Sequence, residues 1–234
     1  MRKFKKFLSN LKLSVLSGLF RGTKLEFTDS GAGIVSKLAG TYELELHPAL
    51  SAAIGRKPEV VVNIGAAEGF YVSALARKLP NSKIIAFEAM DSWHPHLQRN
   101  IKINGVKSFC DLRGFCSVND FEHLICELGS KSSFVLMDIE GGEFDLITHS
   151  IMQKSKHIEF LVEIHDWNSP QKGDNLVALL RKTHEVSIIK QDSKLRFNRL
   201  SGFLKFFFMF FPCLLEKLDE RRNIPMRWVW AIPK

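Results

Sequence analysis

The sequence is poor in cysteine, and its cysteines have no spacing typical of disulfide or metal pairs. No C-x-x-C motif occurs, and no small-residue cleavage site follows the first apolar positions, as a secretory signal requires. We therefore expect free, mostly buried thiols in a reducing compartment. The four cysteines are Cys110, Cys116, Cys126 and Cys213.

The sequence also lacks a long apolar run, an internal repeat and a low-complexity linker. The apolar stretch 206–215 has ten residues, whereas a membrane-spanning helix needs about 20. With 234 residues, of which 45% are hydrophobic and 25% charged, the chain is long enough for one domain with a full core. It is too short for two ordinary domains.

Acidic residues are scarce at both ends of the chain. Residues 1–25 hold seven Lys and Arg and no acid, and residues 194–234 hold nine Lys and Arg against three acids. The remaining residues carry 17 bases and 22 acids, so an acidic body lies between two basic flanks. Phe and Leu recur at helical spacing in the first flank, which predicts a basic amphipathic helical segment over residues 1–40.

A predicted strand that runs into a loop of small residues is the most informative pattern. Residues 60–64 are an apolar strand, and the loop 65–69 leads into a predicted helix over 69–79. Small residues let the backbone approach a ligand closely, and the first N–H groups of the helix face it. The pattern predicts a nucleotide or adenosyl cofactor. Its candidate residues here are Asn63, Gly65, Ala66, Glu68 and Gly69.

A carboxylate follows the next predicted strand, residues 83–87. Glu88 lies about 20 residues beyond the glycine loop, the distance at which an acid accepts hydrogen bonds from both ribose hydroxyls of a cofactor. Ala89 follows it and completes the predicted cofactor-binding set.

The missing G-x-G-x-x-G spacing separates two classes of cofactor. The loop has the form G-x-x-x-G and carries Glu68, whose charge suits the pyrophosphate of a dinucleotide poorly. S-adenosylmethionine has no phosphate and suits such a loop better. A tight strand-to-helix turn without any ligand is the structural alternative.

A third run of residues carries a family resemblance. Residues 138–143 have the form Asp-x-Glu-Gly-x-Glu, and residues 163–165 have the form Glu-x-His. With the glycine loop, Glu88 and the Asn-Gly turn at 104–105, they make the chain resemble the FkbM-like family of S-adenosylmethionine-dependent methyltransferases over about residues 40–190. The family usually has Asp where Asn63 stands. The matching residues of the first run are Asp138, Glu140, Gly141 and Glu143.

Alternating strand-like and helix-like segments predict a mostly parallel α/β sheet covered by helices on both faces. The resemblance implies a Rossmann-like methyltransferase fold with seven strands, the last one antiparallel. We expect a methyltransferase domain over 41–234 with an apolar, basic insertion at about 193–225. The other predicted helices are 92–103, 119–128 and 174–182, and the other predicted strands are 107–112, 134–139, 158–164, 186–190 and 227–232.

The carboxyl ends of parallel strands meet at one edge of a sheet, so the predicted site residues converge there. Alternation along the fifth strand points Glu163 and His165 to the same side. We predict that His165 is the base for a hydroxyl acceptor, because its ordinary pKa of ~6.5 leaves it mostly neutral at pH 7. Asp138 and Glu140 then shape the methionyl end of the cofactor or the acceptor site. A structural role for His165 is the alternative.

The same residues have a second interpretation as a hard-metal site. Asp138, Glu163, His165 and Asp166 carry suitable ligand atoms, as in catechol-type O-methyltransferases. Their spacing fixes no coordination geometry, so no metal is predicted from the sequence.

The sequence thus predicts a methyltransferase that acts on a hydroxyl of a sugar, glycolipid or other secondary metabolite, an acceptor class implied by the resemblance. One alternative is an RNA methyltransferase whose basic, aromatic flanks bind nucleic acid, a partner we favour less. The other is an inactive, methyltransferase-like binding module in which Asn63 marks lost activity.

The two flanks predict where the protein acts. We expect a cytoplasmic protein held at the anionic inner face of a membrane, where a small-molecule, glycan or lipid-linked acceptor is presented. In the alternative, both flanks pack on the domain and residues 206–211 form a lid over the pocket.

Overall fold

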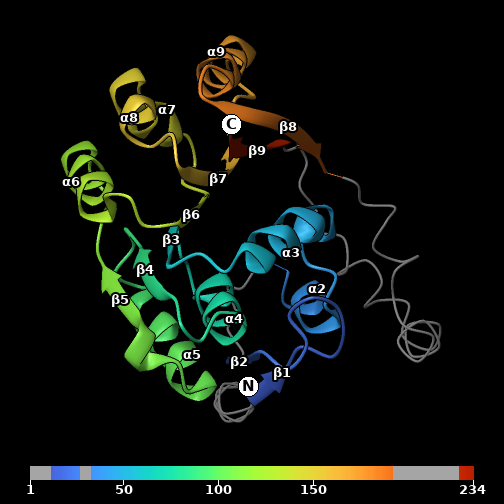
Figure 1. The fold of residues 1–234 in the computed structure, drawn as a ribbon. Coiled ribbons are helices and arrows are strands. Elements are labelled where there is room, and N and C mark those ends of the chain that lie inside the picture. The colour runs from blue at the N-terminus through green and yellow to red at the C-terminus, as the bar shows by residue number, and fades with distance from the viewer. Residues whose placement is uncertain (1–11, 27–32, 192–226) are drawn as a thin grey trace.

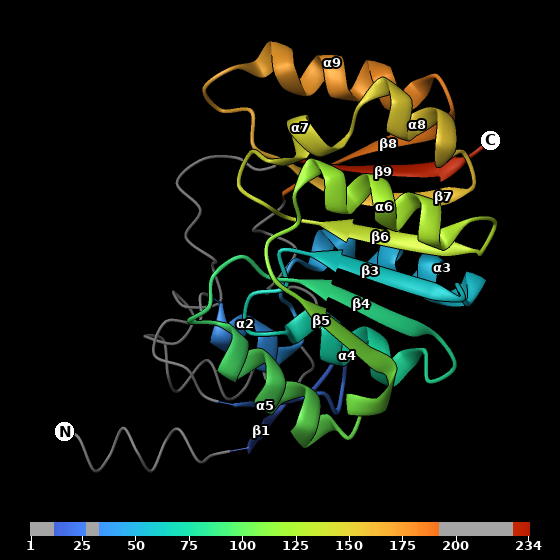
Figure 2. The same ribbon diagram turned by 90° about the vertical axis from the view of Figure 1, so that its left-hand side faces the viewer.

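Seven strands form one sheet in the computed structural model, which describes residues 12–26, 33–191 and 227–234 (Figure 1). Their order across the sheet is β5-β4-β3-β6-β7-β9-β8, and Figure 2 shows them stacked in this order from bottom to top. The first five are parallel, whereas β9 runs antiparallel to both neighbours. The predicted Rossmann-like methyltransferase fold is confirmed. The strands are β3 (Val60–Ile64), β4 (Lys83–Phe87), β5 (Cys110–Arg113), β6 (Ser133–Met137), β7 (Ile158–Ile164), β8 (His184–Lys190) and β9 (Arg227–Pro233).

The central strands are apolar throughout because helices cover both faces of the sheet. Every residue of β3, β6 and β7 is buried. Each predicted strand is present, but the prediction for 107–112 begins three residues too early, because Lys107–Phe109 form a 3-10 helix and β5 starts at Cys110. The prediction for 134–139 runs two residues too far, because β6 ends at Met137 and the chain turns at Glu140, where φ is +53°.

Helices form a layer on each face of the sheet (Figure 1). Leu50, Leu75 and Leu97 belong to the apolar core of one face, and Phe121 and Ile151 to the core of the other. The first layer contains α3 (His47–Arg56), α4 (Phe70–Lys78) and α5 (His94–Asn104). The second contains α6 (Val118–Leu128), α7 (Glu143–Leu146), α8 (His149–Lys154) and α9 (Pro170–Arg181).

The N-terminal part of the chain differs from its prediction. Helical spacing predicts a helix there, but the described residues form a hairpin of β1 (Lys12–Ser14) and β2 (Lys24–Glu26), followed by the short helix α2 (Ile34–Ala39). Packing of the hairpin against α5 overrides the local pattern, since Asn100 Oδ1 and Asn104 Oδ1 each accept a β2 backbone N–H at 2.8 Å. Residues 1–11 and the predicted insertion at 193–225 lie outside the described residues.

No helix among the described residues is long and apolar enough to cross a membrane. The thiols of Cys110, Cys116 and Cys126 are free, but only Cys116 is buried and Cys126 is exposed. The expectation of mostly buried thiols is therefore wrong for the described cysteines. Burial raises the pKa of the Cys116 thiol to about 12, so this thiol stays protonated.

Candidate active site

The loop after β3 is built on a close contact that only glycine permits. Gly65 has a φ of +85°, and a Cβ at this position would lie 1.8 Å from the carbonyl oxygen of Asp138. The backbone N–H of Asp138 donates to Ile64 at 3.0 Å, which brings the end of β6 against this loop. The glycine thus lets the predicted cofactor loop and the Asp138 segment share one edge of the sheet.

Backbone hydrogen bonds fix the position of the loop. The N–H groups of Gly65 and Ala66 donate to the Phe87 carbonyl at 3.0 and 2.9 Å. The next N–H, of Ala67, donates to Oε2 of Glu88 at 2.6 Å, and Ala67 itself has a φ of +45°. The loop is therefore preorganised in the structure, and Glu88 is part of what holds it.

Glu88 stands at the tip of β4 with both oxygens hydrogen-bonded. Oε1 accepts the Met90 N–H at 2.8 Å while Oε2 accepts that of Ala67. The side chain of His94 contacts the Glu88 carbonyl at 2.8 Å. A carboxylate oxygen has more than one acceptor position, so this fixed carboxylate still has acceptor capacity for hydroxyl groups in the cavity that it lines.

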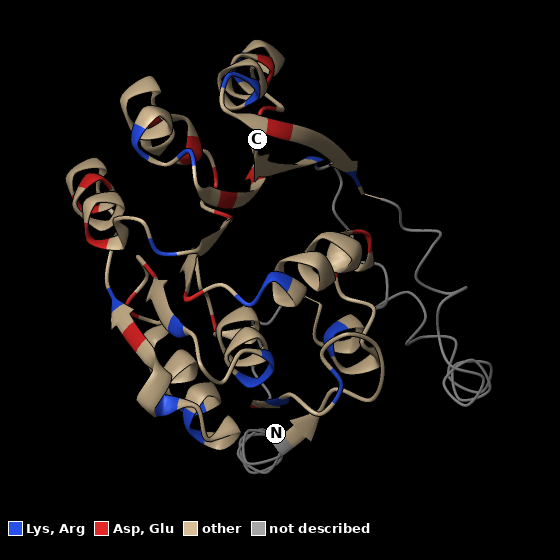
Figure 3. Cartoon of the chain, viewed as in Figure 1, with Lys and Arg blue, Asp and Glu red and all other residues tan. Residues whose placement is uncertain are grey.

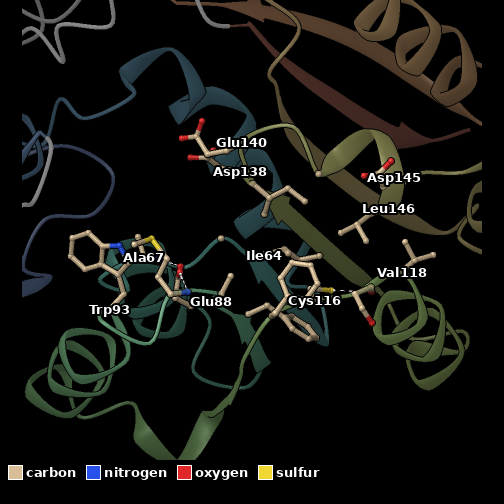
Figure 4. A pocket seen from close by; sticks show the side chains of 18 residues that line it. Ile64, Ala67, Glu88, Trp93, Cys116, Val118, Asp138, Glu140, Asp145 and Leu146 are labelled. Carbon is tan, nitrogen blue, oxygen red and sulfur yellow. Dashed lines mark hydrogen bonds between the residues drawn. The ribbon is translucent and has the colours of Figure 1, made fainter.

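A cavity of about 620 Å³ opens between the loop, Glu88 and the segment after β6 (Figure 4). In this view Glu88 and Trp93 lie on one side, Val118 and Leu146 on the other, and Asp138 and Glu140 above them. The lining residues are Ile64, Gly65, Ala67, Phe87, Glu88, Ala89, Met90, Trp93, Phe115, Cys116, Ser117, Val118, Asp138, Ile139, Glu140, Gly142, Asp145 and Leu146.

Exposed apolar side chains at the cavity are the part that sequence reasoning missed. Met90, Phe115 and Val118 line the cavity although they are large, apolar and exposed; Phe115 is 71% exposed. Exposed apolar groups around a concave site indicate a surface that a ligand covers. A usable signal existed in the sequence, because Phe115 and Val118 directly follow the third strand at the same sheet edge as Glu88.

The opposite wall carries negative charge. Asp138 and Glu140 line the cavity from the segment between β6 and α7, with side chains 34% and 81% exposed. Neither carboxylate has a Lys or Arg partner within 4 Å among the described residues. This wall therefore suits a ligand with positive charge.

His165 lies behind this wall, at the end of β7. Its side chain is 1% exposed, and its Nδ1 lies 3.2 Å from Oε1 of Glu143, which also accepts the His165 backbone N–H at 2.8 Å. The other oxygen of Glu143 accepts the Gly141 N–H at 2.9 Å. Glu143 does open α7, as a first-turn acid should, but its side chain turns inward to hold the imidazole.

The charges around His165 change its expected protonation. Burial lowers the pKa of His165, but the hydrogen bond to Glu143 and the charges of Glu143, Asp138 and Glu140 outweigh it, and the pKa is raised. The expectation of an ordinary pKa is therefore wrong. The pKa of Glu143 is lowered, because its bonds to His165 outweigh the cost of its burial.

Three of the four residues considered as metal ligands meet in space. One ligand atom each from Asp138, Glu163 and His165 lies within 4.8 Å of the others. The fourth, Asp166, pairs with Arg227, which also binds Asp174 at 3.0 Å. Asp166 is thus part of a separate ion-pair cluster between α9 and β9.

The predicted site residues divide between the cavity wall and the layer behind it. Gly65, Glu88, Ala89, Asp138 and Glu140 line the cavity, whereas Asn63, Ala66, Glu68, Gly69 and His165 do not.

Two of the residues behind the wall have clear structural roles. Glu68 forms a buried ion pair with Lys37 of α2, so its charge is neutralised away from the cavity. Gly69, with a φ of +85°, leaves room for Leu97, whose Cδ1 would lie 2.3 Å from a Cβ.

Asn63 is buried at the end of β3. Its Nδ2 donates to the Leu136 carbonyl at 3.5 Å, and its Oδ1 has no hydrogen-bond partner among the described residues. An Asp at this position would place a charge where the structure offers a carbonyl oxygen and no donor.

Several solved methyltransferase structures resemble the chain, whereas no protein-family model and no curated protein sequence matches it. An O-methyltransferase from Bacillus cereus, in complex with SAH, superposes with a TM-score of 0.54 at 9% identity, covering 89% of this chain and 83% of that one. Cofactor-bound Rv0187 from MTB gives a TM-score of 0.54 at 13% identity over 86% and 87% of the two chains. The O-methyltransferase TomG from Streptomyces achromogenes, in complex with SAM, gives 0.51 at 14% identity over 88% and 91%.

At sequence identities of 9%, 13% and 14%, the similarity to these structures shows only that the fold is shared. The chain has the Rossmann-like methyltransferase fold of these proteins, and its membership of the FkbM-like family stays a prediction.

Proposed function

We propose that the protein is an S-adenosylmethionine-dependent methyltransferase that methylates a hydroxyl oxygen. The observation that carries the proposal is the Glu88 carboxylate, fixed by two backbone N–H groups beside the Gly65 loop and facing a 620 Å³ cavity. An acid in this position, at the carboxyl edge of a doubly wound sheet, is suited to bind the two ribose hydroxyls of an adenosyl cofactor. The solved structures of similar fold from B. cereus and S. achromogenes are complexes with SAH and SAM.

The cavity matches the chemistry of this cofactor at both ends. Met90, next to Glu88, and the other exposed apolar side chains of the cavity, Phe115 and Val118, supply an apolar surface for a flat heterocycle. On the opposite side Asp138 and Glu140 present negative charge toward the position of the sulfonium and ammonium groups. No described Lys or Arg lines this cavity, which disfavours a cofactor that carries phosphates.

Methyl transfer then requires alignment and the loss of one proton. The acceptor oxygen attacks the methyl carbon in line with the C–S bond, the C–S bond breaks, and its electron pair stays on sulfur as the neutral thioether. The hydroxyl proton passes to a basic group at the acceptor wall, which Asp138 and Glu140 line, with the predicted base His165 behind them. Holding both reactants in this geometry is the main contribution of the protein.

The proposed acceptor class is the one that the family resemblance implies: a sugar, a glycolipid or another secondary metabolite with a free hydroxyl. The charge distribution supports a lipid-linked acceptor. Among the described helices, α4 and α5 carry only basic charges and α6 only acidic ones (Figure 3). The β1–β2 hairpin packs on α5, so the described part of the first flank, residues 12–25, lies on the basic side of the domain.

The proposed function is tested by supplying S-adenosylmethionine with a labelled methyl group to the purified protein together with extracts of cellular glycans and lipids. We expect label in a product heavier by one methyl group, with transfer reduced at least about tenfold in Glu88→Ala. Cofactor binding without label transfer to any extract would instead favour the inactive binding module.

Membrane association has its own test. Flotation with anionic vesicles should carry the full chain upward, and both salt and deletion of residues 1–11 should weaken the effect. Failure to float at low salt would leave the flanks as parts that pack on the domain.

A further inference from the structure

The side-chain cluster behind the acceptor wall has an unusual composition for a buried site. Nε2 of His165 lies 3.4 Å from Oδ1 of Asp138, 3.6 Å from Oε2 of Glu140 and 3.9 Å from Oε2 of Glu163. All three distances exceed the normal hydrogen-bond length of about 2.9 Å. Three carboxylates therefore surround one buried nitrogen without a direct hydrogen bond to it.

The orientation of the imidazole determines what its Nε2 offers to this cluster. Ionised Glu143 can only accept hydrogen bonds, so Nδ1 of His165 donates to it at 3.2 Å. In the neutral ring, Nε2 then carries a lone pair directed at the carboxylates. Glu143 itself is held by two backbone N–H groups, those of Gly141 and His165. A carboxylate that orients a histidine in this way is the usual partner behind a metal-bound imidazole.

The distances suit a cation placed between these atoms. Ligands about 2.1 Å from one metal ion lie about 3.0 Å apart when adjacent and about 4.2 Å apart when opposite. The distances of 3.4, 3.6 and 3.9 Å fall in this range. The ligand atoms of Asp138, Glu163 and His165 also lie within 4.8 Å of one another, so a small adjustment brings all three to one ion.

The surroundings leave coordination positions free on the side where an acceptor binds. Asp138 and Glu140 line the cavity, whereas Glu163 and His165 lie behind them with side chains 1% exposed. An ion held by the buried pair and by Asp138 would therefore face the cavity. One imidazole nitrogen with two or three carboxylates favours a divalent ion of the Mn²⁺ type over Ca²⁺ or Mg²⁺, which take oxygen ligands.

We propose that Asp138, Glu163 and His165 form a divalent-cation site, with Glu140 as a further ligand and Glu143 as the residue that orients the imidazole. A cation there would polarise an acceptor hydroxyl and lower its pKa, so that the hydroxyl proton is released to solvent water and His165 acts as a ligand in place of its predicted role as a base. The cation-binding statement stands independently of methyl transfer, and only this role in catalysis rests on the proposed function.

The test measures Mn²⁺ binding to the chelator-treated full chain, without S-adenosylmethionine or acceptor, by the loss of the electron paramagnetic resonance signal of free Mn²⁺. We expect saturable binding of one ion per chain, at least about tenfold weaker in Glu163→Gln. The matched control Glu185→Gln, on the exposed face of β8, should bind like the wild type. Coupling of the bound ion to an imidazole nitrogen should be present in the wild type and absent in His165→Gln.

Absence of saturable binding in the wild type, or equal affinity in wild type and Glu163→Gln, would overturn the proposal. If Glu163→Gln fails to fold, Asp138→Asn decides in its place, because this side chain is 34% exposed and its amide keeps the same shape. Calorimetry with S-adenosylmethionine on the same protein separates the two proposals: intact cofactor binding without Mn²⁺ binding removes only the cation site.

Discussion

The two halves of the cavity are held in different ways. On the cofactor half, the Gly65 loop and Glu88 are joined by backbone hydrogen bonds, and each Glu88 oxygen already accepts an N–H. On the acceptor half, side chains hold side chains: Glu143 fixes His165, and Asp138, Glu140 and Glu163 each place a carboxylate oxygen within 4 Å of its Nε2.

This difference shows how each half achieves its geometry. Backbone contacts preorganise the cofactor half before any ligand arrives, so changes there should alter cofactor affinity. The acceptor half concentrates negative charge whose balance depends on a proton, a cation or the charge of the cofactor. Changes at His165 and Glu143, which lie behind the wall, should alter turnover and leave cofactor affinity nearly constant.

The largest effect is expected from Gly65→Ala. A methyl group here would meet the Asp138 carbonyl, and the φ of +85° is unfavourable for alanine. We expect a loss of about 2–5 kcal/mol in stability and of about 100-fold in S-adenosylmethionine affinity, since both halves are forced apart. Gly105→Ala is the matched control, because its φ is +73° and its Cβ would have no neighbour within 4 Å. Thermal unfolding and calorimetry that find the two variants equal would contradict the packing argument.

A smaller effect, confined to the acceptor half, is expected from Glu143→Gln. The Glu143 carboxylate accepts hydrogen bonds from the His165 backbone N–H, from Nδ1 of His165 and from the Gly141 N–H. The amide of Gln keeps the shape of the side chain, but it has only one oxygen and cannot accept all three bonds in the same way. Turnover should fall about 10–100-fold while S-adenosylmethionine affinity changes less than about threefold. Turnover is measured with the identified acceptor, and cofactor affinity is measured separately. If Glu143→Gln lowers both by the same factor, the acceptor half does not act separately from the cofactor half.

Asn63→Asp tests a buried position of the cofactor half. The new carboxylate would face the Leu136 carbonyl without a donor among the described residues. We expect a loss of about 1–3 kcal/mol in the free energy of unfolding at pH 7, with little change in cofactor affinity. Chemical denaturation checks the first value. A more stable Asp variant that binds S-adenosylmethionine tenfold more tightly would show that a charge at this position serves the cofactor.

The smallest effect is a pH dependence that lies outside both halves. Burial lowers the pKa of His184, whose Nε2 contacts the Ile158 carbonyl at 2.8 Å and whose Nδ1 contacts Thr183 Oγ1 at 2.7 Å. Because the folded-state pKa is lowered, the contribution of neutral His184 to the free energy of unfolding is complete above the unfolded pKa of ~6.5. This contribution is lost as pH falls below that value, by at most about 1.4 kcal/mol per pH unit. His184→Gln should reduce the slope of the free energy of unfolding against pH. The slope that remains should come from His47, whose pKa is also lowered by burial. An unchanged slope between pH 7 and 5.5 would contradict the assignment.

Much of the fold follows from the sequence because its signals are local. Continuous apolar runs predict β3, β4, β6 and β7, and the loop glycines predict the turn into α4. The start of α9 at Pro170 is missed, because proline ends a helix in most positions but is favoured in its first turn. The hairpin at residues 12–26 is also missed, since its partner α5 lies far along the chain.

The candidate site is predictable only in part for the same reason. Glu88, Asp138 and Glu140 stand at strand ends and reach the cavity as expected. The ion pair between Glu68 and Lys37 and the contact between Glu143 and His165 each join elements that are distant in the sequence. Spacing in the sequence does not reveal such contacts. It therefore cannot distinguish a residue that lines the cavity from a residue that lies behind the cavity wall.

Calorimetric titration of S-adenosylmethionine into the full chain measures whether Glu88 and the Gly65 loop bind this cofactor. We expect one site per chain and an affinity at least about tenfold lower in Glu88→Ala, since charge-assisted bonds contribute about 1.5–3 kcal/mol each. The control Glu185→Ala, on exposed β8, should match the wild type. Equal affinity in Glu88→Ala and wild type, or no binding at all, would show that Glu88 and the Gly65 loop do not hold this cofactor.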